Sequence, residues 1–465
     1  MGSIYPKTFN VKRIAVIGAG PCGLAAAKYL KAQGTFDTIT VFEQQSQVGG
    51  VWNYNIVVPA PNPIPQTNPF YPPDSPVRVP PEKTPIFPSP MYDQLHANIP
   101  KLLMNFSDLE FLPQSWIYPG RHDIQDYIVK YAQDVRDLIR FCVQVKSVLL
   151  RPQNGEDKWH VVAESTTDGQ VTNEVFDAVV VANGHYSTPF VPNIKNISEF
   201  HQAHPSVIIH SKNYHSPETF RDKKTIIVGN GPSGQDIAYQ INKVSKGQTL
   251  LSVRHGTPQE KLDHIGCREI AEIDEFLIPQ RGVRLKDGRV ETDIDAIVFC
   301  TGFRYSLPFL KDLEKDIITN GACVHGLYKH LFLIQHPTIV FSVLNMKIVP
   351  FPISEAQAAV FSAVWSNRLH LPPKPEMLRW NREAEQKAGD KLHVMADGQD
   401  GVYLNELHDW AVTASTIAKE PPMWGDEKFW MRSIFHKAKK VFEEQGCKAT
   451  TLEELGFKYA PGWDD

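Results

Sequence analysis

An apolar strand, a glycine-rich turn and a helix follow one another twice in this chain, as "IAVIGAGPCGLAAA" at residues 14–27 and as "IIVGNGPSGQDIA" at residues 226–238. In such a turn the first glycine allows the tight bend, the second lets the backbone approach a pyrophosphate, and the third lets the helix pack on the strand. The free amides and the positive dipole end of the helix then attract the phosphates. The chain is therefore predicted to belong to the α/β class and to contain two dinucleotide-binding (Rossmann-like) domains.

The first glycine turn is followed by an acid. The strand "TITVFE" ends at Glu43, twenty residues past Gly23, where a carboxylate accepts hydrogen bonds from the ribose diol of a dinucleotide. A glycine pair follows in "GGVW", where the backbone can pass close to a cofactor and Trp52 supplies an apolar wall. The predicted contacts of this first site are Gly18, Ala19, Gly20, Pro21, Cys22, Gly23, Glu43, Gly50, Val51 and Trp52.

The second glycine turn is followed by a cation instead. The strand "TLLSVR" ends at Arg254, also twenty residues past Gly234, the last glycine of its turn. A ribose 2′-phosphate is repelled by a carboxylate and held by a guanidinium, whose forked donors match phosphate oxygens. Ser252 and Arg254 therefore favour NADPH, with a solvated surface arginine as the alternative. Two sites of opposite charge preference predict two dinucleotides that exchange electrons directly, FAD held at the first site and NADPH visiting the second.

The NADPH-binding domain is predicted to be inserted in a discontinuous FAD-binding domain. The expected boundaries are 1–186 and 305–465 for the FAD-binding domain and 187–304 for the NADPH-binding domain. Apolar residues at helical spacing predict one amphipathic helix over 121–140, and the last third of the chain is expected to be mostly helical. Residues 59–90 contain thirteen prolines and are expected to form neither a helix nor a central strand. A surface excursion is favoured for them over a substrate-contacting loop.

Composition and charge argue against several kinds of partner. The net charge is −4 and there is no basic run, so neither nucleic acid nor an anionic membrane is expected to bind. The longest apolar stretch, residues 331–344, is interrupted by polar residues and a proline, and no membrane anchor is expected. The six cysteines form no CxxC pair, which indicates a reducing compartment, by default the cytoplasm, and no dithiol redox centre. No metal site is expected, because a proline and a strand-like run interrupt the four clustered histidines His201, His204, His210 and His215.

The chain resembles the flavin-containing monooxygenases (class B flavoprotein monooxygenases), in particular their short soluble microbial branch. The resemblance covers nearly the whole chain and is carried by "VIGAGPCGL", "GGVWNY", "VANGHY", "VGNGPSGQDIA", "CTGF" and "VPFPISEAQAA". The family motif FxGxxxHxxx(Y/F) is incomplete, because His204 and Ser206 stand in place of its Phe and Gly, while His210 and Tyr214 are kept. Tyr214, where Baeyer–Villiger relatives typically have Trp, favours oxygenation of a heteroatom.

The resemblance implies an FAD- and NADPH-dependent monooxygenase. NADPH would reduce FAD, and dioxygen would add at flavin C4a. A soft nucleophile of a small molecule, an amine nitrogen or a sulfur, would then attack the resulting C4a-hydroperoxyflavin. Two alternatives stay open: Baeyer–Villiger oxygenation of ketones, and a non-enzymatic flavin redox sensor. The sequence does not fix the oligomeric state, and a homodimer is among the options.

The resemblance also implies roles for single residues. Asn98 matches a family asparagine beside flavin C4a, where an uncharged amide forms hydrogen bonds without supplying the proton that would discharge the intermediate. A turn asparagine before Ile99-Pro100 is the alternative. Gln357 is expected where a helix N-terminus faces the flavin, and Val145 is expected to meet the adenine through its backbone. The implied contacts with FAD are Val51, Trp52, Asn98, Ile99, Val145 and Gln357, and those with NADPH are Ala97, Ser233, Gly234, Gln235 and Asp236.

Overall fold

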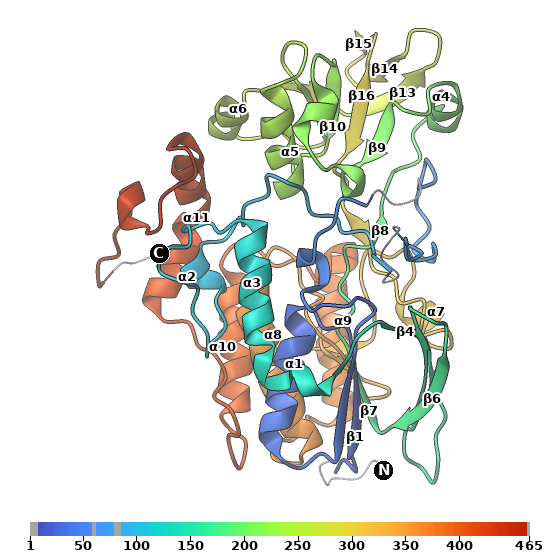
Figure 1. Cartoon of the computed structure of the whole chain (residues 1–465), viewed down its shortest axis with the longest axis vertical. Coiled ribbons are helices and arrows are strands. Elements are labelled where there is room, and N and C mark those ends of the chain that lie inside the picture. Colours follow the sequence, from blue (N-terminus) through green and yellow to red (C-terminus); the bar gives the residue numbers. More distant parts are fainter. Residues whose placement is uncertain (1–7, 58–61, 79–84, 463–465) are drawn as a thin grey trace.

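The computed structural model describes residues 8–57, 62–78 and 85–462, which form two α/β units, each built on a parallel sheet (Figure 1). In the described residues the sheet of the first unit has seven strands in the order β18-β19-β20-β7-β1-β2-β3. These are β1 Arg13–Ile17, β2 Thr38–Phe42, β3 Ile139–Arg140, β7 Ala178–Val181, β18 Leu327–Tyr328, β19 Phe332–Leu333 and β20 Ile339–Phe341. The strands from β20 to β3 run parallel, and β18 and β19 form an antiparallel edge.

The first sheet separates two hydrophobic cores, because successive residues of a strand point to opposite faces. Ile14 and Val16 of β1 pack with the helices, whereas Ala15 and Ile17 face an antiparallel sheet of three strands. The helices on the first face are α1 Pro21–Gln33, α3 Arg121–Tyr131, α8 Pro350–Trp365, α10 Gln399–Ala411 and α11 Asp426–Glu444. The strands on the second face are β4 Val143–Leu150, β5 Trp159–Ser165 and β6 Val171–Phe176. Shorter or peripheral helices are α2 Lys101–Met104, α7 Glu314–Ile317 and α9 Lys374–Ala388.

The second unit is formed by residues that lie between two parts of the first unit in the sequence, and it is at the top of Figure 1. It starts after β8 Thr188–Pro189 and ends before β17 Phe303–Arg304, and these two strands pair antiparallel with each other. Its parallel strands are β9 Ile208–His210, β10 Thr225–Val228, β11 Leu250–Val253, β12 Arg268–Ala271 and β16 Ala296–Phe299, in the order β12-β11-β10-β16-β9. The helices are α4 Ile197–Ala203, α5 Pro232–Asn242 and α6 Gln259–Ile265, and a small sheet contains β13 Ile273–Leu277, β14 Gly282–Leu285 and β15 Val290–Glu291. The predicted fold class, two Rossmann-like units with the second inserted in the first, is confirmed.

The single helix predicted over 121–140 is wrong in its second half. The α-helix ends at Tyr131, and a 3-10 segment, Gln133–Leu138, leads into β3. Ile139 and Arg140 pair with Val41 and Phe42 of β2, so the chain has to leave the helix early to reach the sheet edge.

The proline-rich segment 59–90 forms neither a helix nor a central strand in its described residues, as predicted. Residues 58–61 and 79–84 lie outside the described part. The favoured surface excursion is only partly right, because buried Gln66 exchanges two backbone hydrogen bonds with Val191 of the second unit. Asp74 also pairs with the buried Lys212 at 2.7 Å. The segment therefore links the two units.

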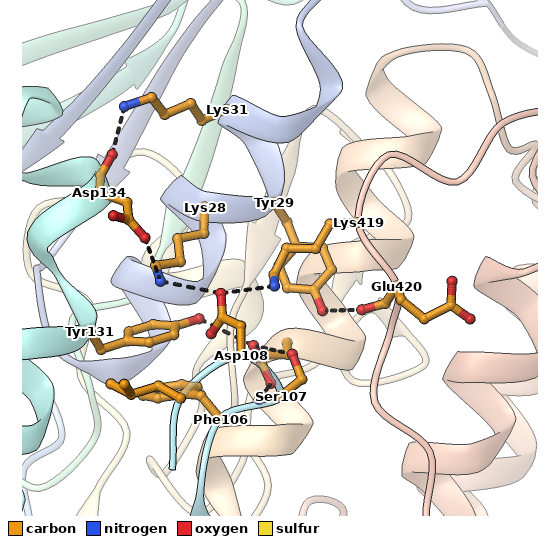
Figure 2. Close-up of polar contacts among 12 residues, drawn as sticks. Lys28, Tyr29, Lys31, Phe106, Ser107, Asp108, Tyr131, Asp134, Lys419 and Glu420 are labelled. Carbon is orange, nitrogen blue, oxygen red and sulfur yellow. Dashed lines mark hydrogen bonds and ion pairs between the residues drawn. The ribbon is translucent and has the colours of Figure 1, made fainter. Parts of the chain in front are cut away.

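A polar network connects α1, α3 and α8 of the first unit, and Figure 2 shows its members Lys28, Ser107, Asp108, Tyr131 and Lys419. Glu355 of α8 accepts hydrogen bonds from the backbone amide of Ser107 at 2.7 Å, from the Ser107 hydroxyl at 2.9 Å and from Tyr131 Oη at 3.2 Å. Nearby, Asp108 pairs with Lys28 of α1 at 3.3 Å and with Lys419 at 3.0 Å. The network joins segments that lie far apart in the sequence.

Candidate functional site

The first glycine turn connects β1 to α1 at the carboxyl edge of its sheet. Gly18 has a φ of 102°, and a Cβ added there would lie 2.6 Å from the carbonyl oxygen of Ala182. A Cβ on Gly23 would lie 1.9 Å from the carbonyl oxygen of Gly18. Both positions therefore need glycine for packing within the chain itself. Among the described residues no side chain caps the start of α1, so its first amides are available to bind an anion.

The glycine pair Gly49-Gly50 lies directly against this turn. The Gly49 amide donates to the Ala19 carbonyl at 3.0 Å, and a Cβ on Gly50 would lie 3.2 Å from Cα of Gly20. Gln125 of α3 closes the other side, since a Cβ on Gly49 would lie 2.1 Å from its Oε1. Two glycine loops thus meet without side chains between them, which fits a bound diphosphate. Gln125 was not predicted, because helical periodicity alone does not distinguish it.

Glu43 lies at the end of β2 and is only 4% exposed. Its carboxylate accepts hydrogen bonds from the amides of Ala19 at 2.8 Å and Gln45 at 2.9 Å, and burial raises its pKa to about 7. Further lone pairs of the carboxylate remain for ribose hydroxyls. The amide of Val143 donates to the Glu43 carbonyl at 2.8 Å, which brings Val145, two residues along β4, close to the acid.

Asn98 is exposed and lies on a partly buried segment that is bonded to the start of α3. The amide of Ala97 donates to the Pro119 carbonyl at 2.9 Å, and the amide of Arg121 donates to the Leu95 carbonyl at 3.3 Å. α3 in turn contacts the 3-10 turn Gly50–Trp52. The same helix therefore packs against the Asn98 segment and against the glycine loops of the first site. Within the described ranges no hydrogen bond occupies the Asn98 amide group, which leaves it free for a ligand. Other predicted contacts are half-buried: Pro21, Cys22, Gly50, Val51, Trp52 and Ile99.

The second glycine turn repeats the geometry of the first. Gly229 has a φ of 103°, and a Cβ on Gly234 would lie 2.0 Å from the Gly229 carbonyl oxygen. A Cβ on Gly231, in contrast, would meet no atom of the described residues within 4 Å, and none of their side chains caps the start of α5. Gln235 stiffens the turn by donating to the Asn230 carbonyl at 2.7 Å. Ser233 is exposed in the first turn of α5. The open surface over Gly231 fits a second diphosphate.

The two residues predicted to bind a 2′-phosphate have different surroundings. The side chain of Arg254 is 73% exposed, and its Nε donates to Glu272 Oε1 at 3.0 Å, which leaves the terminal nitrogens of the guanidinium available. Ser252 is buried, and its hydroxyl donates to the Ala271 carbonyl at 3.0 Å. The Ser252 hydroxyl therefore bonds within the sheet, while the Ser252 carbonyl supports the glycine turn by accepting from the Gly229 amide at 2.9 Å.

Two other predicted contacts have partners inside the protein. Asp236 accepts hydrogen bonds from Tyr92 and from Gln240, and burial raises its pKa. Gln357 accepts from the Val343 amide at 2.8 Å and donates to Tyr403 Oη at 3.0 Å.

The helix that carries Gln357 starts earlier than expected. α8 begins at Pro350, so Gln357 lies about two turns inside it and not at its N-terminus. Its bond to Val343 supports a left-handed backbone, with a φ of 55°, just after β20.

The chain has two glycine turns, each at the start of a helix with available amides. Glu43 follows the first turn and Arg254 follows the second, an arrangement that defines a protein with two different bound dinucleotides. The family is established by sequence: the chain belongs to the flavin-binding monooxygenase-like family, whose profile matches residues 88–259 and 271–423. An NAD(P)-binding Rossmann-like domain profile matches residues 16–64, which include the first glycine turn and Glu43. The predicted family resemblance is confirmed.

Similar proteins include one named as a thiol-specific monooxygenase and one named as an S-oxygenase. A thiol-specific monooxygenase of Saccharomyces cerevisiae is 32% identical in an alignment of 465 positions that covers 97% of each chain. Flavin-containing monooxygenase FMO GS-OX-like 2 of Arabidopsis thaliana is 32% identical over 88% of this chain and 87% of its own. The solved structure of S-allyl-L-cysteine S-oxygenase from Allium sativum has a TM-score of 0.77 and 28% identity, over 97% of this chain and 98% of its own.

Among the helices of the described residues, none combines the length and the apolar character needed to cross a bilayer.

Proposed function

We propose that this protein is an NADPH- and O2-dependent FAD monooxygenase that oxygenates the sulfur of a small thiol or thioether. The observation that carries the proposal is the pair of glycine turns. The strand that follows the first turn leads to Glu43, and the strand that follows the second leads to Arg254. The carboxylate suits the free adenosine ribose of FAD, and the guanidinium suits the 2′-phosphate of NADPH. Sulfur is preferred over an amine nitrogen because the relatives from yeast and Allium sativum are named for thiol and S-oxygenation.

The residues around the first glycine turn would hold FAD, and those around the second glycine turn would hold NADPH. Bound FAD, reduced by hydride from NADPH, supplies the oxygen-activating chemistry. The amides at the start of α1 would bind the FAD diphosphate, and Glu43 would bind the ribose. Asn98 would offer neutral amide donors and an acceptor to the reacting groups without releasing a proton. Overall, NADPH, a proton, O2 and the sulfur compound would give NADP⁺, water and the S-oxygenated product.

The expected domain boundaries follow the same division. We propose residues 1–186 and 305–465 as the FAD-binding domain and 187–304 as the NADPH-binding domain, a division supported by the pairing of β8 with β17 at the two junctions. The six unpaired cysteines support a reducing compartment such as the cytoplasm.

A product assay across four substrate classes tests the proposal. The purified protein, with the flavin it carries, would be incubated with NADPH and a thiol, a thioether, a tertiary amine or a cyclic ketone. We expect S-oxygenated product from the thiol or the thioether. An N-oxide alone would move the substrate class to amines, an ester from the ketone would indicate Baeyer–Villiger chemistry, and no product in any case would favour a redox sensor.

A further inference from the structure

A second cation lies beside Arg254. Glu272 binds Arg254 through Oε1, at 3.0 Å from the arginine Nε, and it binds Lys286 Nζ through Oε2. Because the two oxygens of one carboxylate hold both cations, Arg254 and Lys286 are close neighbours, although they are far apart in the sequence. No motif of the sequence indicates Lys286.

The topology places all three side chains at the edge that carries the second glycine turn. β10, β11 and β12 are parallel neighbours, with Val228 opposite Ser252 and Val253 opposite Ala271. Arg254 and Glu272 therefore leave the sheet side by side, at the same edge at which Gly229 begins its turn. Lys286 follows β14, and its own amide donates to the Glu272 carbonyl at 2.9 Å, so its backbone is fixed there as well.

Exposure and charge suit an anionic ligand. The side chains of Arg254 and Lys286 are 73% and 56% exposed, whereas that of Glu272 is 25% exposed. The hydrogen bond from Lys286, followed by that from Arg254, holds the pKa of Glu272 below its usual value, so this carboxylate stays charged. Two cations and one anion leave a net positive charge, and the carboxylate uses only Nε of the guanidinium, so its terminal nitrogens remain available to phosphate oxygens.

We propose that Lys286 is a second determinant of coenzyme choice, which binds the 2′-phosphate of NADPH together with Arg254. The proposal rests on the proposed function, in which the second site takes NADPH. Glu272 keeps the two cations together in the absence of the coenzyme. A lysine contributes a point charge and an arginine a planar fork, so the pair surrounds a phosphate in a way that neither side chain does alone.

Isothermal calorimetry on the purified holoprotein tests the proposal with two probes, adenosine 2′,5′-bisphosphate and AMP, which differ only in the 2′-phosphate. We expect Lys286→Gln to weaken binding of the bisphosphate about fivefold, the range of one exposed charge contact, and to leave AMP unchanged. The loss should shrink as salt is added. Arg254→Ala should produce a larger loss of the same selectivity. In steady-state kinetics, Lys286→Gln should raise the KM for NADPH but not for NADH.

Arg289→Gln is the matched control. Arg289 lies on the same hairpin and pairs with Asp287 at 2.6 Å, so this change removes one positive charge without touching the Glu272 cluster. If Lys286→Gln and Arg289→Gln have equal effects while Arg254→Ala abolishes the preference for the bisphosphate, the role of Lys286 is overturned and the assignment of NADPH stands. If the wild-type protein binds the two probes equally, both the role of Lys286 and the assignment of NADPH to the second site are overturned.

Discussion

At the scale of single residues, Glu43 and Arg254 occupy equivalent positions in two similar folds but differ in exposure. Glu43 is buried and bonded to its own glycine turn, whereas Arg254 is largely exposed and bonded to one carboxylate. A closed first site suits a cofactor that stays bound, and an open second site suits a coenzyme that exchanges. The contrast agrees with FAD at the first site and NADPH at the second.

Asn98 is expected to control how efficiently NADPH is converted into product. Its amide is exposed, carries no charge and lies on a segment fixed to α3. Asn98→Ala should retain bound flavin and NADPH oxidation, but the product formed per NADPH should fall about tenfold, with H2O2 released instead. Product and H2O2 are measured together, with Gln94→Ala on the same segment as a control. An unchanged product yield would remove Asn98 from the mechanism.

The distance in sequence from a glycine motif predicted where a residue lies better than it predicted the direction of its side chain. Gly18, Gly23 and Glu43 lie together as the spacing predicts. Ser252 and Gln357, in contrast, bond to Ala271 and Val343 inside the protein. The direction of a side chain depends on neighbours that are distant in sequence, and no spacing encodes them.

At the scale of elements, the three glycines of a turn have separable roles, which gives a prediction. A Cβ on Gly234 would clash with the Gly229 carbonyl, whereas a Cβ on Gly231 would meet no atom within 4 Å in the part of the chain that the structure describes. Gly231→Ala should therefore preserve thermal stability and bound flavin but weaken the binding of NADP⁺ at least tenfold, because the pyrophosphate of the coenzyme approaches this position. Gly234→Ala should destabilise the fold itself. Calorimetry and thermal unfolding of both variants check this, and full affinity in Gly231→Ala would contradict the proposed phosphate position.

Element types were predictable where periodicity was strong, and boundaries were not. The strands that precede the two glycine turns, β1 and β10, and the C-terminal helices form as their apolar patterns predict. The helix expected over 121–140 ends at Tyr131, because strand pairing of Ile139 outweighs local helical propensity. The proline-rich segment packs between the units through Gln66 and Asp74, contacts that its composition does not reveal.

At the scale of the whole molecule, the contact between the two units could not be predicted. Tyr92 of the first unit bonds to Asp236 of α5, and the Asp93 amide donates to the His215 carbonyl at 3.0 Å. Tyr54 also donates to Asp93 at 3.0 Å. These residues belong to no common motif, so only the folded chain brings them together beside the Asn98 segment.

The buried carboxyl group of Glu355 predicts a pH dependence of global stability. Burial raises the pKa of Glu355 from 4.5 to about 7, so between these values the folded protein binds a proton that the unfolded chain releases. The contribution of Glu355 to stability should therefore fall as pH rises through this window, by up to about 1.4 kcal/mol per pH unit. Glu355→Gln removes this titration, so the stability of the wild type relative to the variant should decrease from pH 5 to pH 7. Any hydrogen bond that glutamine loses adds an offset independent of pH.

Urea unfolding of both proteins at pH 5, 6 and 7 measures this difference. Glu420→Gln is the control, because Glu420 is exposed at the edge of the same network and only its backbone carbonyl bonds to Tyr29. Parallel curves for the wild type and Glu355→Gln would contradict the assigned titration.

The most direct test of the account follows the oxygen atom. The purified protein would be incubated with NADPH, ¹⁸O2 and S-allyl-L-cysteine or another thioether, and the product would be analysed by mass spectrometry alongside NADPH consumption. We predict one ¹⁸O atom per S-oxide and close to one product per NADPH oxidised, with NADH a poor substitute. A colourless protein, a product that lacks ¹⁸O, or equal turnover with NADH and NADPH would contradict the account of two sites with different coenzymes.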